Sequence, residues 1–392
     1  MDERSDATIG VLGSYGGRNV GDEAILTALL DRVRAERPDM RVLLFSRDPG
    51  HSRRAHPDVE VTGWEGVCRE RISEHLRRLT LLVLGGGGIL YDTEARRYLR
   101  LARTAQDLGV PVFTYAVGAG PLTDGTDCAW VRTTLSDAAE VTVRDEESKL
   151  VLEEAGLTRP VTVTADPALL LEPGDGGGEL LRAEAVPQGA RLVGMSVREP
   201  GRAAEHLDEE GYHQLLADVG DFLVHRLDAH VVFVPMERDD IRHAHAVVSR
   251  MADADRCTVL HGSYRPQQVL DIVARLDLAI GMRLHFLVFA ALAGIPLLPL
   301  PYAGKVFDFA QQVGAPALRG VVRENTGLLL AEVDRLWDER PARAPHTSAR
   351  LTSMRLRAAG TADRLLACLD RTAPRPLGDR DRAAPTVTPA PG

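Results

Sequence analysis

Two polar side chains that could do chemistry, Arg283 and His285, stand in the run Gly281-Met282-Arg283-Leu284-His285 at the start of a predicted helix. Free N–H groups and the helix dipole favour an anion at this position. An arginine there is unfavourable unless an anionic partner compensates its charge. A histidine can transfer a proton near neutral pH. The pair therefore predicts an anion-binding site at Arg283, with His285 as a candidate acid or base.

The helix that carries this pair is apolar on almost every side. Its apolar residues follow the spacing of a buried face, and two phenylalanines make the opposite side apolar too. Arg283 and His285 are the only polar residues before Gly294. The helix is therefore expected to be nearly enclosed, with chemistry confined to its first turn.

Three glycine-bearing turns follow predicted strands, at residues 13–23, 85–88 and 118–121. Open α/β sheets bind ligands at the carboxyl ends of their strands, and glycine lets backbone N–H groups approach a ligand closely. Tight packing of the turn at 85–88 is the alternative. Asp22 and Glu23 open a predicted helix, so we expect them to act as caps rather than as catalysts. The candidate substrate-binding residues of these turns are Gly16, Asn19, Asp22, Gly86, Gly87 and Gly88.

Two further cations follow predicted strands in the second half of the chain. Arg198 comes after the strand expected at 192–196, on the side that should face the first half. An arginine there can hold a carboxylate or phosphate through two parallel hydrogen bonds. Lys305 comes after the strand expected at 297–300 and could meet a phosphate as a point charge. Taken singly, each also fits an ordinary solvated loop charge.

No set of metal ligands stands out. His243 and His245 are two residues apart on a predicted helix, so their side chains diverge. Asp253 and Asp255 follow a helix and not a strand end. The cysteines have none of the paired spacings of zinc sites or redox dithiols, so we expect reduced thiols and no metal; they are Cys68, Cys128, Cys257 and Cys368.

Short β-branched runs alternate with amphipathic helices, as in parallel βαβ units. We expect strands at 8–12, 41–45, 81–84, 112–115, 141–143 and 161–163, with helices at 24–37, 94–108 and 146–155. After a glycine-rich break, strands at 192–196, 231–235, 258–260, 278–280 and 297–300 and helices at 212–227, 239–251, 266–275 and 284–293 repeat the pattern. The chain therefore holds two successive doubly wound α/β units.

These elements predict a Rossmann-like domain at residues 7–172, a linker at 173–189 and a second Rossmann-like domain at 190–345. A C-terminal helix is expected at 346–371. The end, at 372–392, is rich in proline, alanine and charge, and we expect it to be disordered.

Composition excludes several classes of function. The 392 residues, 44% of them apolar, suffice for two cores. The net charge of −9 gives no basic field for nucleic acids. No apolar run approaches the roughly 20 residues that span a bilayer, so we expect a cytoplasmic protein. No glycine turn has the spacing of a dinucleotide fingerprint or a phosphate loop, which disfavours a dehydrogenase or an ATPase.

Several short pieces, taken in order, resemble the polysaccharide pyruvyl transferase family. The likeness covers residues 9–314, and the Met-Arg-Leu-His run with the glycine turns is its most specific part. The resemblance implies a GT-B-like α/β fold, with two Rossmann-like domains facing across a cleft. The pieces are residues 16–26, 84–90, Val143-Arg144-Asp145, Ala165-Asp166-Pro167, Arg198, the run at 281–285 and residues 302–306.

The family's reaction moves the pyruvyl group of phosphoenolpyruvate onto two hydroxyls of a sugar, forming a cyclic ketal and releasing phosphate. By resemblance, Arg198 and Arg283 hold the donor's carboxylate and phosphate on the second domain, His285 transfers a proton, and the first domain binds the acceptor. This chemistry needs no redox cofactor, and we expect no cofactor or metal. A cell-wall or capsule sugar is the usual acceptor, but no residue names it here, and a soluble small molecule stays an alternative. The oligomeric state is not indicated.

Two other functions stay open, since a fold alone does not determine function. A GT-B glycosyltransferase that uses a nucleotide sugar should have an acidic residue near Arg283 for the ribose hydroxyls, and none lies at 282–294. A non-catalytic sugar-binding relative would keep the fold without the chemistry. The joint presence of Arg198, Arg283 and His285 argues against that second alternative.

Overall fold

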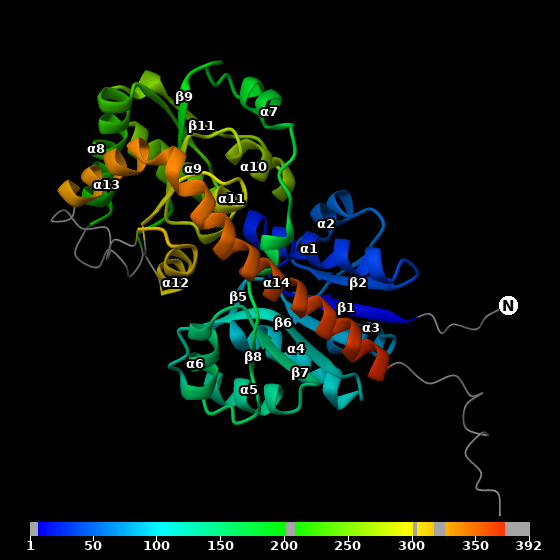
Figure 1. Ribbon diagram of the computed structural model, residues 1–392. Helices are drawn as coiled ribbons and strands as arrows, with labels where there is room; N and C mark the ends of the chain where they lie inside the picture. Colours follow the sequence, from blue (N-terminus) through cyan, green and yellow to red (C-terminus); the bar gives the residue numbers. More distant parts are fainter. Residues whose placement is uncertain (1–6, 201–207, 301–303, 317–325, 373–392) are drawn as a thin grey trace, which may run out of the picture.

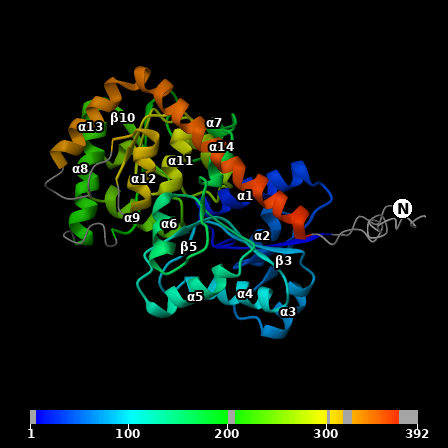
Figure 2. The same cartoon turned by 60° about the horizontal axis from the view of Figure 1, so that its bottom comes forward.

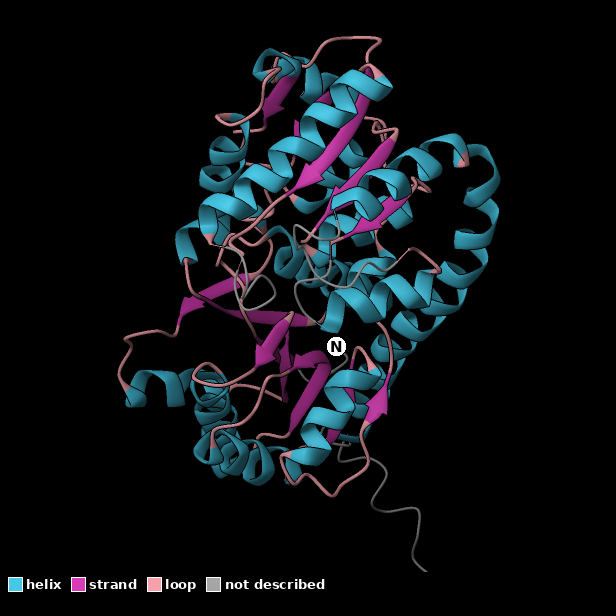
Figure 3. Ribbon diagram, turned by 90° about the vertical axis from the view of Figure 1, so that its left-hand side faces the viewer, coloured by secondary structure: helices cyan, strands magenta, loops and turns pink. Residues whose placement is uncertain are grey.

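The computed structural model describes residues 7–200, 208–300, 304–316 and 326–372. Two parallel β-sheets form separate halves of the molecule, and helices cover both faces of each (Figure 1). Figure 3 shows the two sheets as distinct groups of strands. Residues 7–172 form the N-terminal domain. Residues 190–316 form the sheet and most helices of the C-terminal domain.

The N-terminal sheet has the order β3-β2-β1-β4-β6-β7-β8, with β5 paired to β6, and its paired strands are parallel. The sequence predicted all of these strands except β3 and β5, which are only 4 and 3 residues long. The strands are β1 (Thr8–Leu12), β2 (Arg41–Ser46), β3 (Glu60–Gly63), β4 (Leu81–Gly85), β5 (Gly88–Leu90), β6 (Val112–Ala119), β7 (Glu140–Val143) and β8 (Thr162–Val163).

Alternating strand residues point to opposite faces of this sheet, so each face has its own core. Ile9 packs with Leu29 of the first helix on one face, and Leu12 packs in a second core with Leu99 on the other. The helices are α1 (Val20–Glu36), α2 (Pro49–Ala55), α3 (Arg69–Arg77), α4 (Ala95–Asp107), α5 (Gly125–Ser136), α6 (Glu146–Glu154) and the 3-10 helix η1 (Pro167–Leu170).

The C-terminal sheet has the order β11-β10-β9-β12-β13 and is also parallel. Its strands are β9 (Arg191–Ser196), β10 (Ala229–Phe233), β11 (Cys257–Val259), β12 (Leu278–Gly281) and β13 (Leu297–Pro299). Its helices are α7 (Gly177–Ala183), α8 (Glu209–Leu227), α9 (Arg238–Val248), η3 (Ala254–Arg256), α10 (Pro266–Val273), α11 (Leu284–Leu292), α12 (Gly304–Val313) and α13 (Thr326–Asp338).

The predicted linker at 173–189 contains a helix, which corrects the expectation that its glycines prevent regular structure. Helix α7 packs against α10, and a Cβ on Gly177 would lie 1.9 Å from the carbonyl oxygen of Asp271. Leu181 of α7 is buried in the core beneath it. Gly177 therefore allows α7 and α10 to pack closely. The flexibility of glycine, on which the linker prediction depended, does not indicate such packing.

Helix α14 (Arg340–Thr372) runs along both halves of the molecule (Figure 2). Met354 is buried in the core that both domains share, and Leu365 is buried with Tyr115 of the N-terminal domain. The helix contacts α11 and α12 as well as η1 and β6. The helix begins earlier than the predicted 346, and it contacts both domains. The tail expected at 372–392 lies, apart from Thr372, outside the described residues.

The two domains share a hydrophobic core. Ala24 and Ile25 of α1 lie in one buried cluster with Phe286 and Leu287 of α11 and with Leu169 of η1. The backbone N–H of Val20 donates to the carbonyl of Met236 across the domain boundary, at 2.9 Å. The starts of α1 and α11 are therefore held against each other.

Candidate active site

The predicted site residues gather where the strand order of each sheet reverses. In the N-terminal sheet this point lies between β1 and β4, and in the C-terminal sheet it lies between β9 and β12. Doubly wound sheets bind ligands at such points, outside the carboxyl ends of the strands. Asn19, Gly86, Arg198 and Arg283 each lie in the loop after one of these four strands.

Helix α1 begins at one side of the site, and Asn19 caps it. The Asn19 side chain accepts hydrogen bonds from the N–H groups of Gly21 (2.9 Å) and Asp22 (3.2 Å). Glu23 instead accepts from the N–H of Gly16, at 2.7 Å. The expectation that Asp22 and Glu23 cap the helix is therefore wrong: the preceding asparagine already satisfies the free N–H groups, and Asp22 faces the turn after β4.

The glycine turns are filled by side chains of the protein itself. Gly86 has a φ of +91° and lies against the ring of Tyr15, and Gly87 has a φ of +68° and lies against the Asp22 carboxylate. A Cβ on Gly87 would be 1.9 Å from Asp22 Oδ1. Gly16, with a φ of +74°, lies against Ser46, and Gly88 lies near Arg144. These contacts support the packing alternative for the turn at 85–88.

His285 lies in the first turn of α11 and packs directly on Gly21 of α1. A Cβ on Gly21 would be 1.9 Å from His285 Nδ1, so only glycine leaves room for the imidazole. His285 Nε2 lies 3.3 Å from Asp166 Oδ2, which is within ion-pair distance. The two atoms do not meet the angular criteria of a hydrogen bond. Arg144 also binds Asp166, at 3.2 Å, and Asp145, at 3.3 Å.

The pKa values of Asp166 and Asp22, the two carboxyl groups near His285, are shifted in opposite directions. Burial raises the pKa of Asp166, but His285, Arg144 and the Ala168 N–H outweigh this effect and hold the pKa well below its usual range. Burial raises the pKa of Asp22 to about 6, although His285 and a hydrogen bond from Ser14 act in the opposite direction. Asp166 is therefore ionised and Asp22 can carry a proton near neutral pH.

Replacing Asp22 with asparagine is expected to stabilise the folded protein at high pH. Because its folded-state pKa lies above the unfolded-state value, the carboxyl contributes stability below about pH 4 that is lost as the pH rises through about 6. The shift corresponds to roughly 3 kcal/mol, and partial exposure of Asp22 reduces this to about 1–2 kcal/mol at pH 8.

Urea unfolding of the Asp22→Asn variant between about pH 4 and pH 8 measures this difference. The gain should shrink toward pH 4. Asp31→Asn, which alters an exposed acid of the same helix, should show almost no gain. A gain for Asp22→Asn that does not vary with pH would contradict the assignment.

Arg283 precedes α11, and the protein's own carboxylates supply its anionic partner. Its Nη2 lies 2.5 Å from Asp240 Oδ1 and 2.9 Å from Glu237 Oε2, and its Nε donates to Asp240 as well. Asn19 donates to the other oxygen of Glu237, which links the two domains. The inference that Arg283 needs an anion holds, but the structure meets that need with two acidic residues at the start of α9, Glu237 and Asp240.

Arg198 lies beside this group, whereas Lys305 lies on α12 near Glu147 of the N-terminal domain. The Tyr212 hydroxyl donates to the Arg198 carbonyl at 2.8 Å and lies 2.7 Å from Met282 Sδ, so the chain at Arg198 is held next to the residue before Arg283. Arg198 also pairs with Glu199. Lys305 is in the first turn of α12, where Gly304 packs against Glu147 of the N-terminal domain. The neighbouring positions 301–303 lie outside the described residues.

A separate hollow of about 660 Å³ lies on the N-terminal domain. It is lined by Trp64, Trp130, Arg97 and Arg100, among others, and by none of the predicted site residues. The hollow and the residues of the site therefore belong to different parts of this domain.

Four charged residues of the site were not predicted as such. Arg144 and Asp166 appeared only within the motifs of the family resemblance, and Glu237 and Asp240 were not singled out. Glu237 and Asp240 lie more than 40 residues before Arg283 in the sequence. The absence of acidic residues at 282–294 therefore did not show which acidic residues surround Arg283 in the fold. This removes the reason given against a nucleotide-sugar enzyme.

Solved structures with a similar fold include proteins in complex with UDP or UDP-glucose. HepE from Anabaena, solved with UDP-glucose, matches 93% of this chain and 99% of its own, with a TM-score of 0.63 and 13% identity. MnaA from S. aureus, solved with UDP, matches 93% and 97%, with a TM-score of 0.63 and 12% identity. A putative UDP-N-acetylglucosamine 2-epimerase from Listeria monocytogenes matches 92% and 94%, with a TM-score of 0.61 and 14% identity.

Two parallel sheets, each covered by helices on both faces, give the chain a GT-B-like fold of two Rossmann-like domains. The model of the polysaccharide pyruvyl transferase family matches residues 19–304. The chain belongs to the polysaccharide pyruvyl transferase family and is a transferase. The amylovoran biosynthesis protein AmsJ of Erwinia amylovora is 20% identical to it over 379 residues, covering 84% of this chain and 91% of AmsJ. Within the described ranges, every helix is too short or too polar to cross a membrane.

Proposed function

We propose that the protein transfers the pyruvyl group of phosphoenolpyruvate to two hydroxyls of a sugar or glycan, forming a cyclic ketal and releasing phosphate. One observation carries the proposal: the starts of α1 and α11 bring His285, backed by ionised Asp166, next to Asp22. A proton acceptor and a proton donor thus meet where two helix N-termini favour an anionic substrate.

The reaction needs a proton transfer in each direction. First, the methylene carbon of the donor gains a proton, and the adjacent carbon bonds to an acceptor oxygen that loses its own proton. Then phosphate leaves with its bonding electrons as the second hydroxyl oxygen attacks the same carbon and loses a proton. Asp22 is suited to supply the first proton, and His285 is suited to accept one from a hydroxyl.

Arg283 and Arg198 would hold the donor's charged groups. Asp240 is 2% exposed and fixes the Arg283 guanidinium. The Glu237 side chain is 35% exposed, so an anionic group of the donor could replace it at the edge of the guanidinium. Lys305, across from Glu147, would add positive charge beside the phosphate.

Donor binding can be tested by thermal unfolding. Phosphoenolpyruvate at millimolar concentration is expected to raise the Tm, since a ligand stabilises the folded state it binds. UDP-glucose and GDP-mannose, at the same concentration, are expected to leave the Tm unchanged. A shift with the nucleotide sugars and none with phosphoenolpyruvate would sink the proposal.

A nucleotide-sugar glycosyltransferase is the second candidate, and Glu237 is the observation that favours it. Its partly exposed carboxylate lies next to Arg283, where an acid could bind the ribose hydroxyls of a nucleotide. The thermal experiment above separates the two candidates, because each predicts stabilisation by a different donor.

Replacing Gly21 with alanine is expected to lower kcat by about 10²-fold and to cost some stability, because the added methyl group crowds a buried contact between the domains. The new methyl group would displace the His285 imidazole, and a displacement of about 1 Å can cost this much in rate. Alanine is favoured over glycine in a helix by about 0.5–1 kcal/mol, so the helix itself does not suffer.

Steady-state rates and urea unfolding measure the two effects of Gly21→Ala. Gly360→Ala is the matched control, because no atom lies within 4 Å of a Cβ at that position of α14. Equal rates for Gly21→Ala and Gly360→Ala would show that the position of His285 does not matter.

A further inference from the structure

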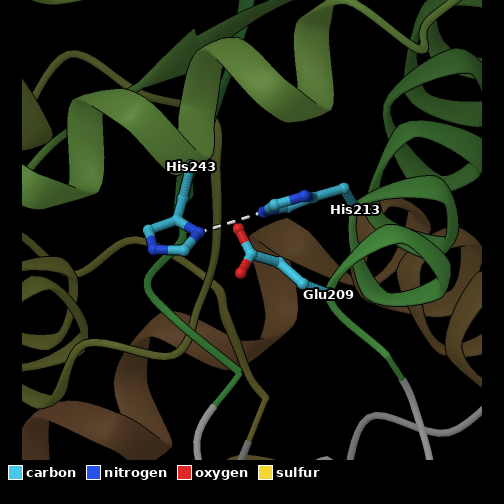
Figure 4. Close-up of side chains that lie close together, drawn as sticks. All are labelled: Glu209, His213 and His243. Atoms are coloured by element: carbon cyan, nitrogen blue, oxygen red, sulfur yellow. Dashed lines mark hydrogen bonds between the residues drawn. The ribbon is translucent and has the colours of Figure 1, made fainter.

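Three potential metal ligands from two helices converge away from the candidate active site. Glu209 and His213 are four residues apart on α8 and so share a face of that helix, and His243 lies on α9. One ligand atom from each lies within 4.8 Å of the others. Figure 4 shows the two imidazoles and the carboxylate turned toward one another. His213 and His243 are 3% and 2% exposed, so the protein itself holds both rings in place.

We propose that Glu209, His213 and His243 bind a divalent first-row transition metal such as Zn²⁺. The ligand atoms are a carboxylate oxygen of Glu209, Nε2 of His213 and Nδ1 of His243. Two imidazoles and one carboxylate are a ligand set that Zn²⁺ binds, with water in the remaining position. The inference does not depend on the identity of the donor substrate.

The geometry of the two rings supports this assignment. His213 Nε2 and His243 Nδ1 are 3.0 Å apart, so one of them carries the shared hydrogen. An ion that replaces this hydrogen would meet a ring nitrogen from each helix, and ring nitrogens are the atoms through which histidine binds metals.

Arg242 contacts two of the three proposed ligands and so competes with a metal ion for them. Its Nη1 lies 3.0 Å from Glu209 Oε1, and its Nη2 donates to His243 Nε2 at 3.1 Å. With Nε2 accepting from Arg242, the His243 proton sits on Nδ1 and points to His213. A metal at Nδ1 moves that proton to Nε2, which no longer accepts from Arg242. The Arg242 side chain is 68% exposed and can turn into solvent.

The metal would join α8 to α9 next to the group that fixes Arg283. His243 is three residues after Asp240 on α9, and Asp240 binds the Arg283 guanidinium. A bound ion would therefore lie one helical turn from the residue that binds Arg283.

Calorimetric titration of the chelator-treated full chain with ZnCl₂ tests the proposal. One ion is expected to bind per chain and to raise the Tm, and Co²⁺ in its place is expected to give visible absorption bands of a bound ion. Glu209→Gln, at an exposed position, should weaken binding by at least about 10-fold while the fold stays intact. His213→Ala should abolish it. Arg242→Ala should bind the ion several-fold more tightly than the unaltered chain.

His261→Ala is the control. It removes one ring of another histidine pair, His245 and His261, whose nitrogens are also 3.0 Å apart but lie at the surface. Binding unaffected by His261→Ala and weakened by Glu209→Gln supports the site. No binding to the unaltered chain, or equal binding by the chain with and without Glu209→Gln, overturns it.

Discussion

The His285→Ala variant, supplied with phosphoenolpyruvate and a competent acceptor, is expected to release phosphate about 10²–10⁴-fold more slowly than the unaltered protein. The imidazole touches Gly21 of α1 and lies 3.3 Å from the ionised Asp166, which suits it to accept a proton from an acceptor hydroxyl. Asp166 keeps Arg144 and the Ala168 N–H as partners, so the fold should survive.

Single-turnover phosphate release, with donor binding followed by thermal shift, separates chemistry from binding in this variant. Donor binding is expected to persist, because Arg283 and Arg198 are retained. His245→Ala, which removes an imidazole from α9 outside the site, should keep the full rate. A His285→Ala variant that turns over normally would remove this residue from the mechanism.

The Arg144→Met variant is expected to lose about 3–5 kcal/mol of unfolding free energy, the usual cost of breaking a buried ion pair. The Arg144 side chain is 5% exposed and neutralises both Asp145 and Asp166. Without it, two largely buried carboxylates lose a positive partner, and Asp166 keeps only His285 among its described ion-pair partners. The pKa of Asp166 should rise as a result, because one of the groups that lowers it is gone.

Urea unfolding measures this loss, and a double-mutant cycle with Asp166→Asn isolates the pair. The double variant should be less destabilised than the sum of the single variants, with a coupling of about 1–3 kcal/mol. Arg103→Met, which breaks pairs with the exposed Asp107 and Asp137, should cost less than about 1 kcal/mol. A similar loss for Arg144→Met and Arg103→Met would contradict the role assigned to the buried group.

The strand pattern predicted the doubly wound architecture because parallel strands buried on both faces leave long apolar runs in the sequence. It missed β3, of which only one residue is buried, and β5, which follows directly on the glycine turn after β4. It also predicted only part of α14. That helix contacts both domains through residues such as Met354 and Leu365, and tertiary contacts of this kind are not encoded in local periodicity.

The candidate site could be predicted in part. The first turn of α11 stood out because two polar residues open an otherwise apolar helix, and the structure places both at the domain boundary. Their partners did not stand out, because Asp166 and Asp240 come from other parts of the chain and meet them only in the fold. The glycines after β4 could not be interpreted from the sequence. Glycine leaves room for a close neighbour, and that neighbour can be a ligand or, as here, the side chains of Tyr15 and Asp22.

The central claim is tested most directly by incubating the protein with isotopically labelled phosphoenolpyruvate and a panel of sugars and glycans, followed by mass spectrometry and phosphate measurement. The account predicts that one acceptor gains the labelled pyruvyl group as a ketal, with one phosphate released per group transferred, and that His285→Ala forms almost none of this product. Transfer of a sugar from a UDP or GDP sugar to the same acceptors, with no incorporation of the pyruvyl label, would contradict it.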